Sequence, residues 1–145
     1  MKEILFVNAC LRGKEKSRTW RLSQAFLDAC RKRWPQVEIK ERDLTACDLP
    51  ILTGPLTEER DRLVVEAPED PMFAPAREMA QADLVVIAAP TGPHLPRCLK
   101  VYLEWASTLG ITFHYTEHGQ EGLCRAEHVV YITTPEAHWG AELRL

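Results

Sequence analysis

The tripeptide Ser17-Arg18-Thr19 is the strongest candidate for chemistry in this sequence. It stands where a polar loop gives way to a helical pattern, and a helix N-terminus offers unpaired backbone N–H groups and the positive end of the helix dipole. With two hydroxyl groups added, such a position can cradle a small anion, for example a monophosphate, without a metal ion. The alternative is that Ser17 and Thr19 only cap the helix.

Two common phosphate-binding motifs are missing from the loop before this tripeptide. Residues 9–17 contain neither G-x-G-x-x-G nor a P-loop lysine motif. This argues against a dinucleotide-binding Rossmann site and against a P-loop NTPase. A phosphate held by a different kind of loop suggests flavin mononucleotide.

The histidines offer a second kind of chemistry. His94 could donate a proton to a reduced quinone or azo nitrogen, although an exposed loop histidine without a role is the alternative reading. His114 and His118 are four residues apart, but Gly119 and the lack of helical periodicity place them in a loop, so no metal site is expected. Cys10 is expected to be a small buried side chain without a chemical role.

Alternating strands and helices must position these residues. The apolar run Ile4–Val7 predicts a buried strand, and helical spacing of apolar residues predicts a helix over Arg18–Arg33 with Ser17 as its N-cap. The period-two pattern of Val37–Arg42 predicts a more polar strand near a sheet edge.

A long excursion follows from Leu44 to Pro75, where five prolines interrupt any continuous helix. Within it and just after it, only Thr57–Glu66 and Pro75–Gln81 have a helical pattern. The excursion also carries many apolar side chains, which need a surface to pack against, and a second subunit is a good candidate.

The remaining elements complete an α/β pattern. They are a central strand over Leu84–Ala89, a helix that includes Leu99 and ends at Gly110, a polar loop over Thr112–Glu127 and a last strand over His128–Thr133. This alternation predicts a single domain over residues 1–145, an open three-layer α/β fold with a parallel sheet in the order 2-1-3-4. In such sheets, ligands bind at the carboxyl ends of the strands.

Composition narrows the classes of function. The chain has 18 Lys and Arg against 21 Asp and Glu, so no positive excess favours a nucleic-acid partner. No apolar run is long enough to cross a bilayer and no signal-peptide pattern opens the sequence, so we expect no membrane partner and a cytoplasmic protein. The five cysteines are odd in number and contain no C-x-x-C pair, and they are expected to be free thiols.

Several segments carry a family resemblance. The N-terminal stretch Ile4–Ala9, followed by Ser17-Arg18-Thr19, resembles the start of the flavodoxin-like NAD(P)H:flavin and quinone oxidoreductases, a group that includes the FMN-dependent NADH azoreductases. Val86–Pro90 and Leu99–Tyr102 continue the match. The stretch from Gly110 to Leu123 is similar to the family's long G-[VI]-T-F-x-Y-T-E-x-G-x-x-G-L segment.

The resemblance implies a flavodoxin-like fold and an FMN site. Ser17, Arg18 and Thr19 would hold the FMN phosphate, and Tyr115 and His118 would lie on the substrate side. The flavin ring would be lined by Pro90, Thr91, Gly92, His94 and Leu95, with Thr133 and Thr134 at its pyrimidine edge.

Three departures from the family pattern stand out. The family has an aromatic residue or Met after the Ala-Pro pair, where this chain has Thr91-Gly92, and a glycine pair where it has Pro135-Glu136. The family sheet also has a fifth strand, for which this chain has no counterpart. Either the sequence is cut short relative to the natural protein, or a partner covers the open edge of Val129–Ile132.

The resemblance further implies an enzyme. We expect an FMN-dependent oxidoreductase that takes electrons from NADH or NADPH and reduces quinones, azo compounds or flavins by a two-electron ping-pong reaction. A homodimer is expected, because the resembling family is dimeric with active sites near the subunit interface. The alternative is a flavodoxin-like binding or interaction module that has lost flavin binding.

Overall fold

A four-stranded parallel sheet forms the centre of the molecule in the computed structural model, which describes residues 1–46, 49–90 and 95–135. Its strands are β1 (Glu3–Asn8), β2 (Glu38–Asp43), β3 (Leu84–Ala88) and β6 (Val129–Ile132). Their spatial order is β2-β1-β3-β6 and all three pairings are parallel. The predicted order 2-1-3-4 is therefore confirmed, with strand boundaries within one residue of those expected.

The alternation of side chains along β1 builds two cores, one on each face of the sheet. Ile4 and Phe6 join the core under one face, while Leu5 and Val7 join the core under the other. All four are almost fully buried. A strand that is apolar on both sides in this way belongs in the interior of a parallel sheet covered by helices.

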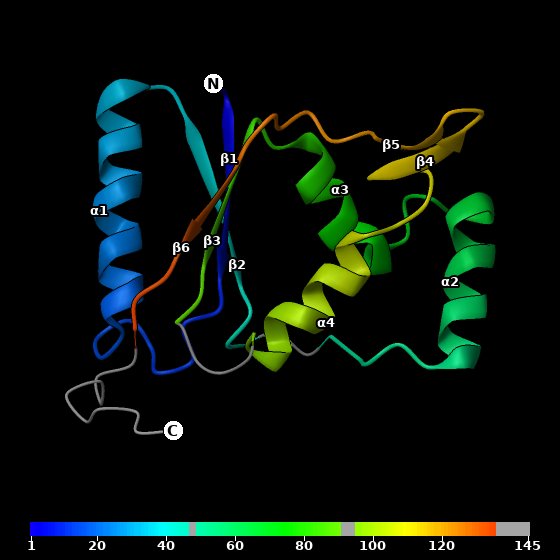
Figure 1. The fold of residues 1–145 in the computed structure, drawn as a ribbon, viewed down its shortest axis with the longest axis horizontal. Helices are drawn as coiled ribbons and strands as arrows, with labels where there is room; N and C mark the ends of the chain where they lie inside the picture. The colour runs from blue at the N-terminus through cyan, green and yellow to red at the C-terminus, as the bar shows by residue number, and fades with distance from the viewer. Residues whose placement is uncertain (47–48, 91–94, 136–145) are drawn as a thin grey trace.

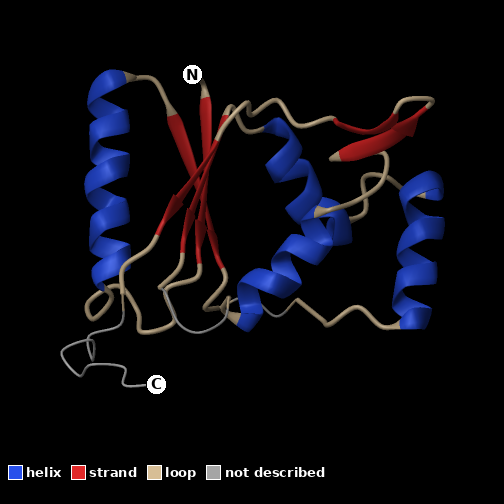
Figure 2. Ribbon diagram, viewed as in Figure 1, coloured by secondary structure: helices blue, strands red, loops and turns tan. Residues whose placement is uncertain are grey.

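Helices cover both faces, as Figure 2 shows. Helix α1 (Arg18–Arg33) packs on one face, and α3 (Ala74–Gln81) and α4 (Arg97–Ala106) pack on the other. A short 3₁₀ turn, η1 (Pro71–Phe73), leads into α3. Helix α2 (Gly54–Glu66) lies farther from the sheet and has no fully buried residue.

Helix α2 begins three residues earlier than Thr57, where the proline pattern had placed its start. Thr53 is the N-cap, and its Oγ1 accepts a hydrogen bond from the N–H of Leu56 at 3.4 Å. Pro55 lies in the first turn, where its missing N–H has no partner to lose. This proline therefore starts the helix instead of interrupting it.

Two predictions for residues 107–122 are wrong. Helix α4 ends at Ala106 and not at Gly110, because the Thr112 hydroxyl donates to the Ala106 carbonyl at 2.8 Å and so satisfies the helix end. Gly110 instead has φ +84° in the turn that follows. The expected polar loop contains an antiparallel hairpin of β4 (Phe113–Thr116) and β5 (Gly119–Gly122), whose four-residue strands are too short and too polar for the pattern to show.

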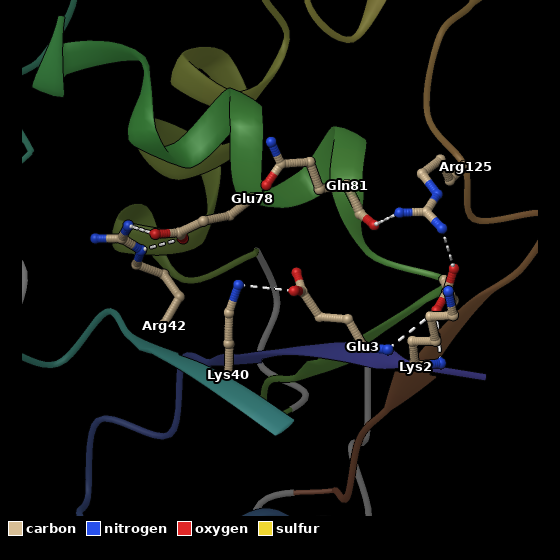
Figure 3. Close-up of polar contacts among 8 residues, drawn as sticks. Lys2, Glu3, Lys40, Arg42, Glu78, Gln81 and Arg125 are labelled. Carbon is tan, nitrogen blue, oxygen red and sulfur yellow. Dashed lines mark hydrogen bonds and ion pairs between the residues drawn. The ribbon is translucent and has the colours of Figure 1, made fainter. Parts of the chain in front are cut away.

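A charged cluster ties β2 and the start of β1 to the α3 side (Figure 3). The Arg42 guanidinium makes a bidentate ion pair with the carboxylate of Glu78 on α3, with Nε 2.9 Å from Oε2. Beside it, Lys40 Nζ lies 2.7 Å from Glu3 Oε2. The charged side chains of edge strand β2 thus form ion pairs on the face of the sheet that α3 covers. On the same face, β1 and β3 carry apolar residues.

Asp83 fastens the start of β1 to the start of β3. Its Oδ2 accepts hydrogen bonds from the backbone N–H of Lys2 at 2.7 Å and of Glu3 at 3.0 Å, and its Oδ1 lies 3.2 Å from Arg125 Nη2. The two backbone N–H donors are the main reason that the pKa of Asp83 lies below its usual value.

Candidate functional site

A cavity of about 300 Å³ opens at the carboxyl ends of the strands, beside the N-terminus of α1. This is the edge where open α/β sheets bind their ligands. In Figure 1, the end of β6 descends to the beginning of α1 at this edge. The cavity is lined by Arg12, Lys16, Ser17, Arg18, Thr19, Arg21, Pro90, Thr134 and Pro135.

Ser17 is the N-cap of α1, as the sequence predicts. Its Oγ accepts a hydrogen bond from the N–H of Trp20 at 3.1 Å, and its own N–H donates to the Gly13 carbonyl at 3.0 Å. Gly13 has φ +82°, a backbone conformation that suits glycine, and it turns the loop into the helix. Capping uses an acceptor lone pair of Ser17, and the hydroxyl proton is shared with the Cys10 sulfur, from which it can turn to a ligand.

Thr19 joins the helix start to the segment that follows β6. Its Oγ1 lies 2.6 Å from Thr134 Oγ1, with either hydroxyl as donor. Arg18 makes a second link, since its Nη2 donates to the carbonyl of Pro135 at 2.8 Å. Two segments more than a hundred residues apart in the chain therefore form one wall of the cavity.

The cavity has a strongly positive lining in a chain of net charge −3. Among the residues that the structure describes, four of those that line the cavity are Arg or Lys and none is acidic. The first turn of α1 also contains no acidic side chain. The N–H groups of Arg18 and Thr19 have no carbonyl partner within the helix, because no turn precedes them. These features together fit an anion at the positive end of α1.

Cys10 lies beside this site, but its surroundings do not make its thiol more acidic. It is buried at the end of β1, and its Sγ is 3.7 Å from the carbonyl oxygen of Ala88. Burial raises the pKa of the Cys10 thiol, and a hydrogen bond with Ser17 opposes only part of that effect. The thiol is therefore neutral near pH 7, as expected for a packing residue.

The residues predicted to bind the cofactor fall into three groups. Ser17, Arg18, Thr19, Pro90 and Thr134 line the same cavity. Thr133 is the neighbour of Thr134, and Leu95 is exposed just before α4. The predictions for Thr91, Gly92 and His94 lie outside the described residues.

The structure places Tyr115 and His118 away from the cavity. Tyr115 belongs to β4, and His118 lies in the turn between β4 and β5. Figure 1 shows this hairpin at the opposite end of the sheet from the start of α1. A single chain thus does not bring these two residues to the anion site. Among the described residues, no group of His, Cys, Asp and Glu could hold a metal ion.

Three cations of the cavity, Arg12, Lys16 and Arg21, were not predicted. They line it together with Arg18. The signal was present in the sequence, because basic residues recur at 12, 14, 16, 18 and 21 around the predicted helix start. Such a recurrence beside an N-cap serine predicts an anion site more strongly than the tripeptide alone.

Fold and site together define a class. A parallel sheet in the order 2-1-3-4, helices on both faces and an anion pocket formed by the first strand-to-helix loop are the features of a flavodoxin-like α/β protein. The family model described as a flavodoxin-like fold matches residues 2–142. The chain belongs to this family.

Curated proteins of known description are similar to this chain in sequence. The chain is 33% identical over 141 residues to an FMN-dependent NADH:quinone oxidoreductase of Clostridium beijerinckii, a match that covers 91% of this chain and 68% of the relative. A protein of the same description from Coprothermobacter proteolyticus is 31% identical, with 96% of this chain and 74% of the relative covered.

Solved structures share the fold. An azoreductase from Bacillus anthracis superposes with a TM-score of 0.79 at 22% identity, covering 97% of this chain and 72% of that one. An FMN-dependent NADH-azoreductase from Bacillus anthracis in complex with FMN gives a TM-score of 0.78 at 19% identity, covering 93% of this chain and 69% of that one.

In the part of this chain that the structure describes, no helix has the length and apolar character needed to span a membrane.

Proposed function

We propose that this chain is an FMN-dependent NADH oxidoreductase that passes two electrons to a small-molecule acceptor such as a quinone. The observation that carries the proposal is the cavity at the start of α1, which combines two hydroxyls, free first-turn N–H groups and four cations. The FMN-dependent NADH:quinone oxidoreductase of Clostridium beijerinckii also supports the proposal, because its sequence matches nearly the whole of this chain.

The residues present fit the phosphate half of FMN. The Ser17 hydroxyl proton can turn from the Cys10 sulfur to a phosphate oxygen, and Arg18 and Thr19 can donate their backbone N–H groups to it. Arg12, Lys16 and Arg21 surround that position with positive charge. Pro90 and Thr134 continue the wall of the cavity towards the ends of β3 and β6, where the flavin ring would lie.

FMN, when bound, supplies the redox chemistry, because it can accept a hydride from NADH and deliver two electrons to an acceptor. The contribution of the chain is to hold the phosphate and orient the ring. The Thr19–Thr134 contact matters here, because it fixes the wall between the phosphate end and the segment after β6. We expect ping-pong kinetics, in which NADH would give up its hydride and NAD⁺ would leave before a quinone, azo compound or flavin enters.

The test is a titration of the purified chain with FMN, followed by an assay of NADH and NADPH oxidation with a quinone. Quenching of flavin fluorescence at micromolar FMN, with riboflavin binding much more weakly, supports the proposal. Parallel lines in double-reciprocal plots at several quinone concentrations support the ping-pong order. No binding at millimolar FMN contradicts the proposal.

The second candidate function is that of a flavodoxin-like binding module that has lost flavin binding. Pro135 favours it, because this residue lines the cavity but has no backbone N–H to offer a flavin. The Pro135 carbonyl already accepts a hydrogen bond from the Arg18 guanidinium. Binding of inorganic phosphate without binding of FMN identifies this outcome.

We also propose that the chain works as a homodimer. Val129 and Tyr131 on β6 are 61% and 47% exposed, on the same side of the sheet as Val85 and Ile87, so an apolar strip lies open at the sheet edge. The hairpin with Tyr115 and His118 could act on a substrate only if a second copy brings it to the anion site. Light scattering at tens of micromolar tests this, and a stable monomer contradicts it.

We include a cytoplasmic location of the protein in the same proposal. The four described cysteines, Cys10, Cys30, Cys98 and Cys124, are free thiols. Unpaired cysteines are usual in a reducing compartment. Fractionation of cells that express the tagged chain tests the location.

A further inference from the structure

The β1–α1 loop (residues 9–17) is held together by a chain of hydrogen bonds. The N–H of Gly13 donates to the carbonyl of Cys10 at 3.0 Å, and the N–H of Ser17 donates to the carbonyl of Gly13 at 3.0 Å. At the start of the loop, the N–H of Cys10 donates to the side-chain Oδ1 of Asn8 at 3.0 Å. Three bonds in a row thus connect the Asn8 side chain to Ser17, the residue that caps α1 at the anion site.

A carboxylate on the neighbouring strand holds the Asn8 side chain. The Asn8 Nδ2 donates to Oε1 of Glu41 on β2 at 3.0 Å. Asn8 is the last residue of β1 and is 2% exposed. Its amide carries a donor on one side and an acceptor on the other, and an ionised carboxylate only accepts hydrogen bonds. The bond to Glu41 therefore directs the amide oxygen of Asn8 to the N–H of Cys10.

Glu41 is an unexpected residue next to a loop that borders an anion site, because a nearby negative charge repels an anion. Lys14, from the middle of the loop, lies against it. The Nζ of Lys14 is 3.7 Å from Oε2 of Glu41 and 5.8 Å from the centre of the Trp20 ring in the first turn of α1. Arg12 and Lys16 line the cavity, whereas Lys14 between them does not. Lys14 thus offsets the charge of Glu41 on the outside of the loop.

The two contacts of Glu41 differ in strength. The Lys14 and Glu41 side chains are 56% and 33% exposed, so water and salt screen their ion pair. The bond from Asn8 to Glu41 is partly buried and has a charged acceptor, and such hydrogen bonds are the stronger kind. The hydrogen bond is therefore the contact through which Glu41 has its larger effect on the loop.

We propose that Glu41 is a positioning residue of the anion site. Through Asn8 it sets the conformation of the β1–α1 loop, and so the position of Ser17 and of the first-turn N–H groups of α1. Neither Glu41 nor Asn8 lines the cavity, so both act through the loop. The identification of the anion with the phosphate of FMN rests on the proposed function, whereas the contacts of the loop do not.

The central experiment compares two replacements of Glu41. Glu41→Leu removes the acceptor for the Asn8 amide, whereas Glu41→Gln keeps an acceptor oxygen and loses the charge. Each full chain is titrated with FMN and with riboflavin by quenching of flavin fluorescence. Glu41→Leu should weaken FMN about three- to tenfold and riboflavin less than about twofold, because only FMN carries the phosphate. Glu41→Gln should bind FMN within about twofold of the unaltered chain.

The same two variants separate positioning from an effect of charge alone. Both remove the negative charge of Glu41, so an effect of charge alone would strengthen FMN binding in both. Positioning predicts weaker binding in Glu41→Leu and rescue in Glu41→Gln. The visible absorption spectrum of FMN at saturation should be the same in all three chains, because the change acts at the phosphate end. Glu38→Leu, at the exposed opposite end of β2, is the matched control and should leave both affinities unchanged.

A double-mutant cycle tests the route through Asn8. Asn8→Ala removes both bonds of the amide and should weaken FMN at least as much as Glu41→Leu. Adding Glu41→Leu to Asn8→Ala should weaken FMN less than about twofold further, because the partner of Glu41 is already absent. Strictly additive losses overturn the route. Urea unfolding checks that each variant is folded, and if Asn8→Ala is not, the comparison of Glu41→Leu with Glu41→Gln decides by itself.

Inorganic phosphate separates this proposal from the proposed function. Its binding to the chain without flavin is followed by phosphorus NMR. If FMN does not bind, but Glu41→Leu weakens phosphate binding and Glu41→Gln restores it, the oxidoreductase proposal fails and the role of Glu41 stands. If the unaltered chain binds neither FMN nor phosphate, both proposals fail.

Three results overturn the role of Glu41 while the proposed function stands. In each of them FMN binds to the unaltered chain and NADH is oxidised. The first is that Glu41→Leu leaves FMN affinity unchanged or higher. The second is that it weakens FMN and riboflavin equally, and the third is that Glu38→Leu weakens FMN as much as Glu41→Leu does.

Discussion

The hydroxyl oxygens of Thr19 and Thr134 lie 2.6 Å apart, although 115 residues separate them in the chain. Thr19 is buried in the first turn of α1, and Thr134 lies in the segment after β6. This contact joins the first strand-to-helix loop to the last strand of the sheet. It places the first helix and the segment after the last strand around one cavity.

Replacing Thr19 with Val should weaken both the fold and the anion site. Valine keeps the shape but leaves the Thr134 hydroxyl without its partner, which should lower the free energy of unfolding by about 1 kcal/mol. FMN affinity should fall by about 1 to 2 kcal/mol, or roughly five- to thirtyfold. Urea unfolding and FMN titration measure the two effects. In a double-mutant cycle with Thr134→Val, strictly additive losses would show that the contact contributes nothing.

Ser17→Asp separates capping from ligand binding. Aspartate caps helices about as well as serine, so the unfolding free energy should stay within about 0.5 kcal/mol of the unaltered chain. Its negative charge enters a pocket suited to an anion, so FMN affinity should fall at least about tenfold. Ser17→Gly is the control, with a weaker cap and no added charge. FMN affinity retained in Ser17→Asp would place the phosphate elsewhere.

Asp83 should make stability depend on acid pH. Because the pKa of Asp83 is lowered in the folded chain, its contribution is complete above the unfolded value of about 3.9 and is lost as pH falls below it towards the folded value. Urea midpoints measured between pH 7 and pH 2 check this for the unaltered chain and for Asp83→Asn. The difference between the two should shrink as the pH falls. A difference that stays constant over that range would contradict the role of ionised Asp83.

Gly110→Ala should destabilise the chain through backbone strain alone. Gly110 has φ +84°, and a Cβ added there would meet no atom within 4 Å. The left-handed conformation costs a non-glycine residue about 1 to 2 kcal/mol, and this should lower the unfolding free energy by that amount. Gly122→Ala is the matched control, since its surroundings are equally open and its φ is not in the left-handed region. Equal stability of the two variants would contradict the strain argument.

The sequence alone determined the central features of the fold. The apolar runs of β1 and β3 predict buried parallel strands, because only strands covered on both faces are apolar on both. Ser17 before a helical pattern predicts the start of α1, because the capping interaction is local. The polar pattern of β2 predicts an edge strand, and with right-handed crossovers this agrees with the observed sheet order.

Only the tertiary structure decided where helix α4 ends and what surrounds the site. Gly110 suited a helix end by its residue type, but the bond from Thr112 to the Ala106 carbonyl ends α4 earlier. The Thr19–Thr134 and Asn8–Glu41 contacts join segments far apart in the chain. Local patterns carry no information on such contacts, because the packing of helices on the sheet brings these residues together.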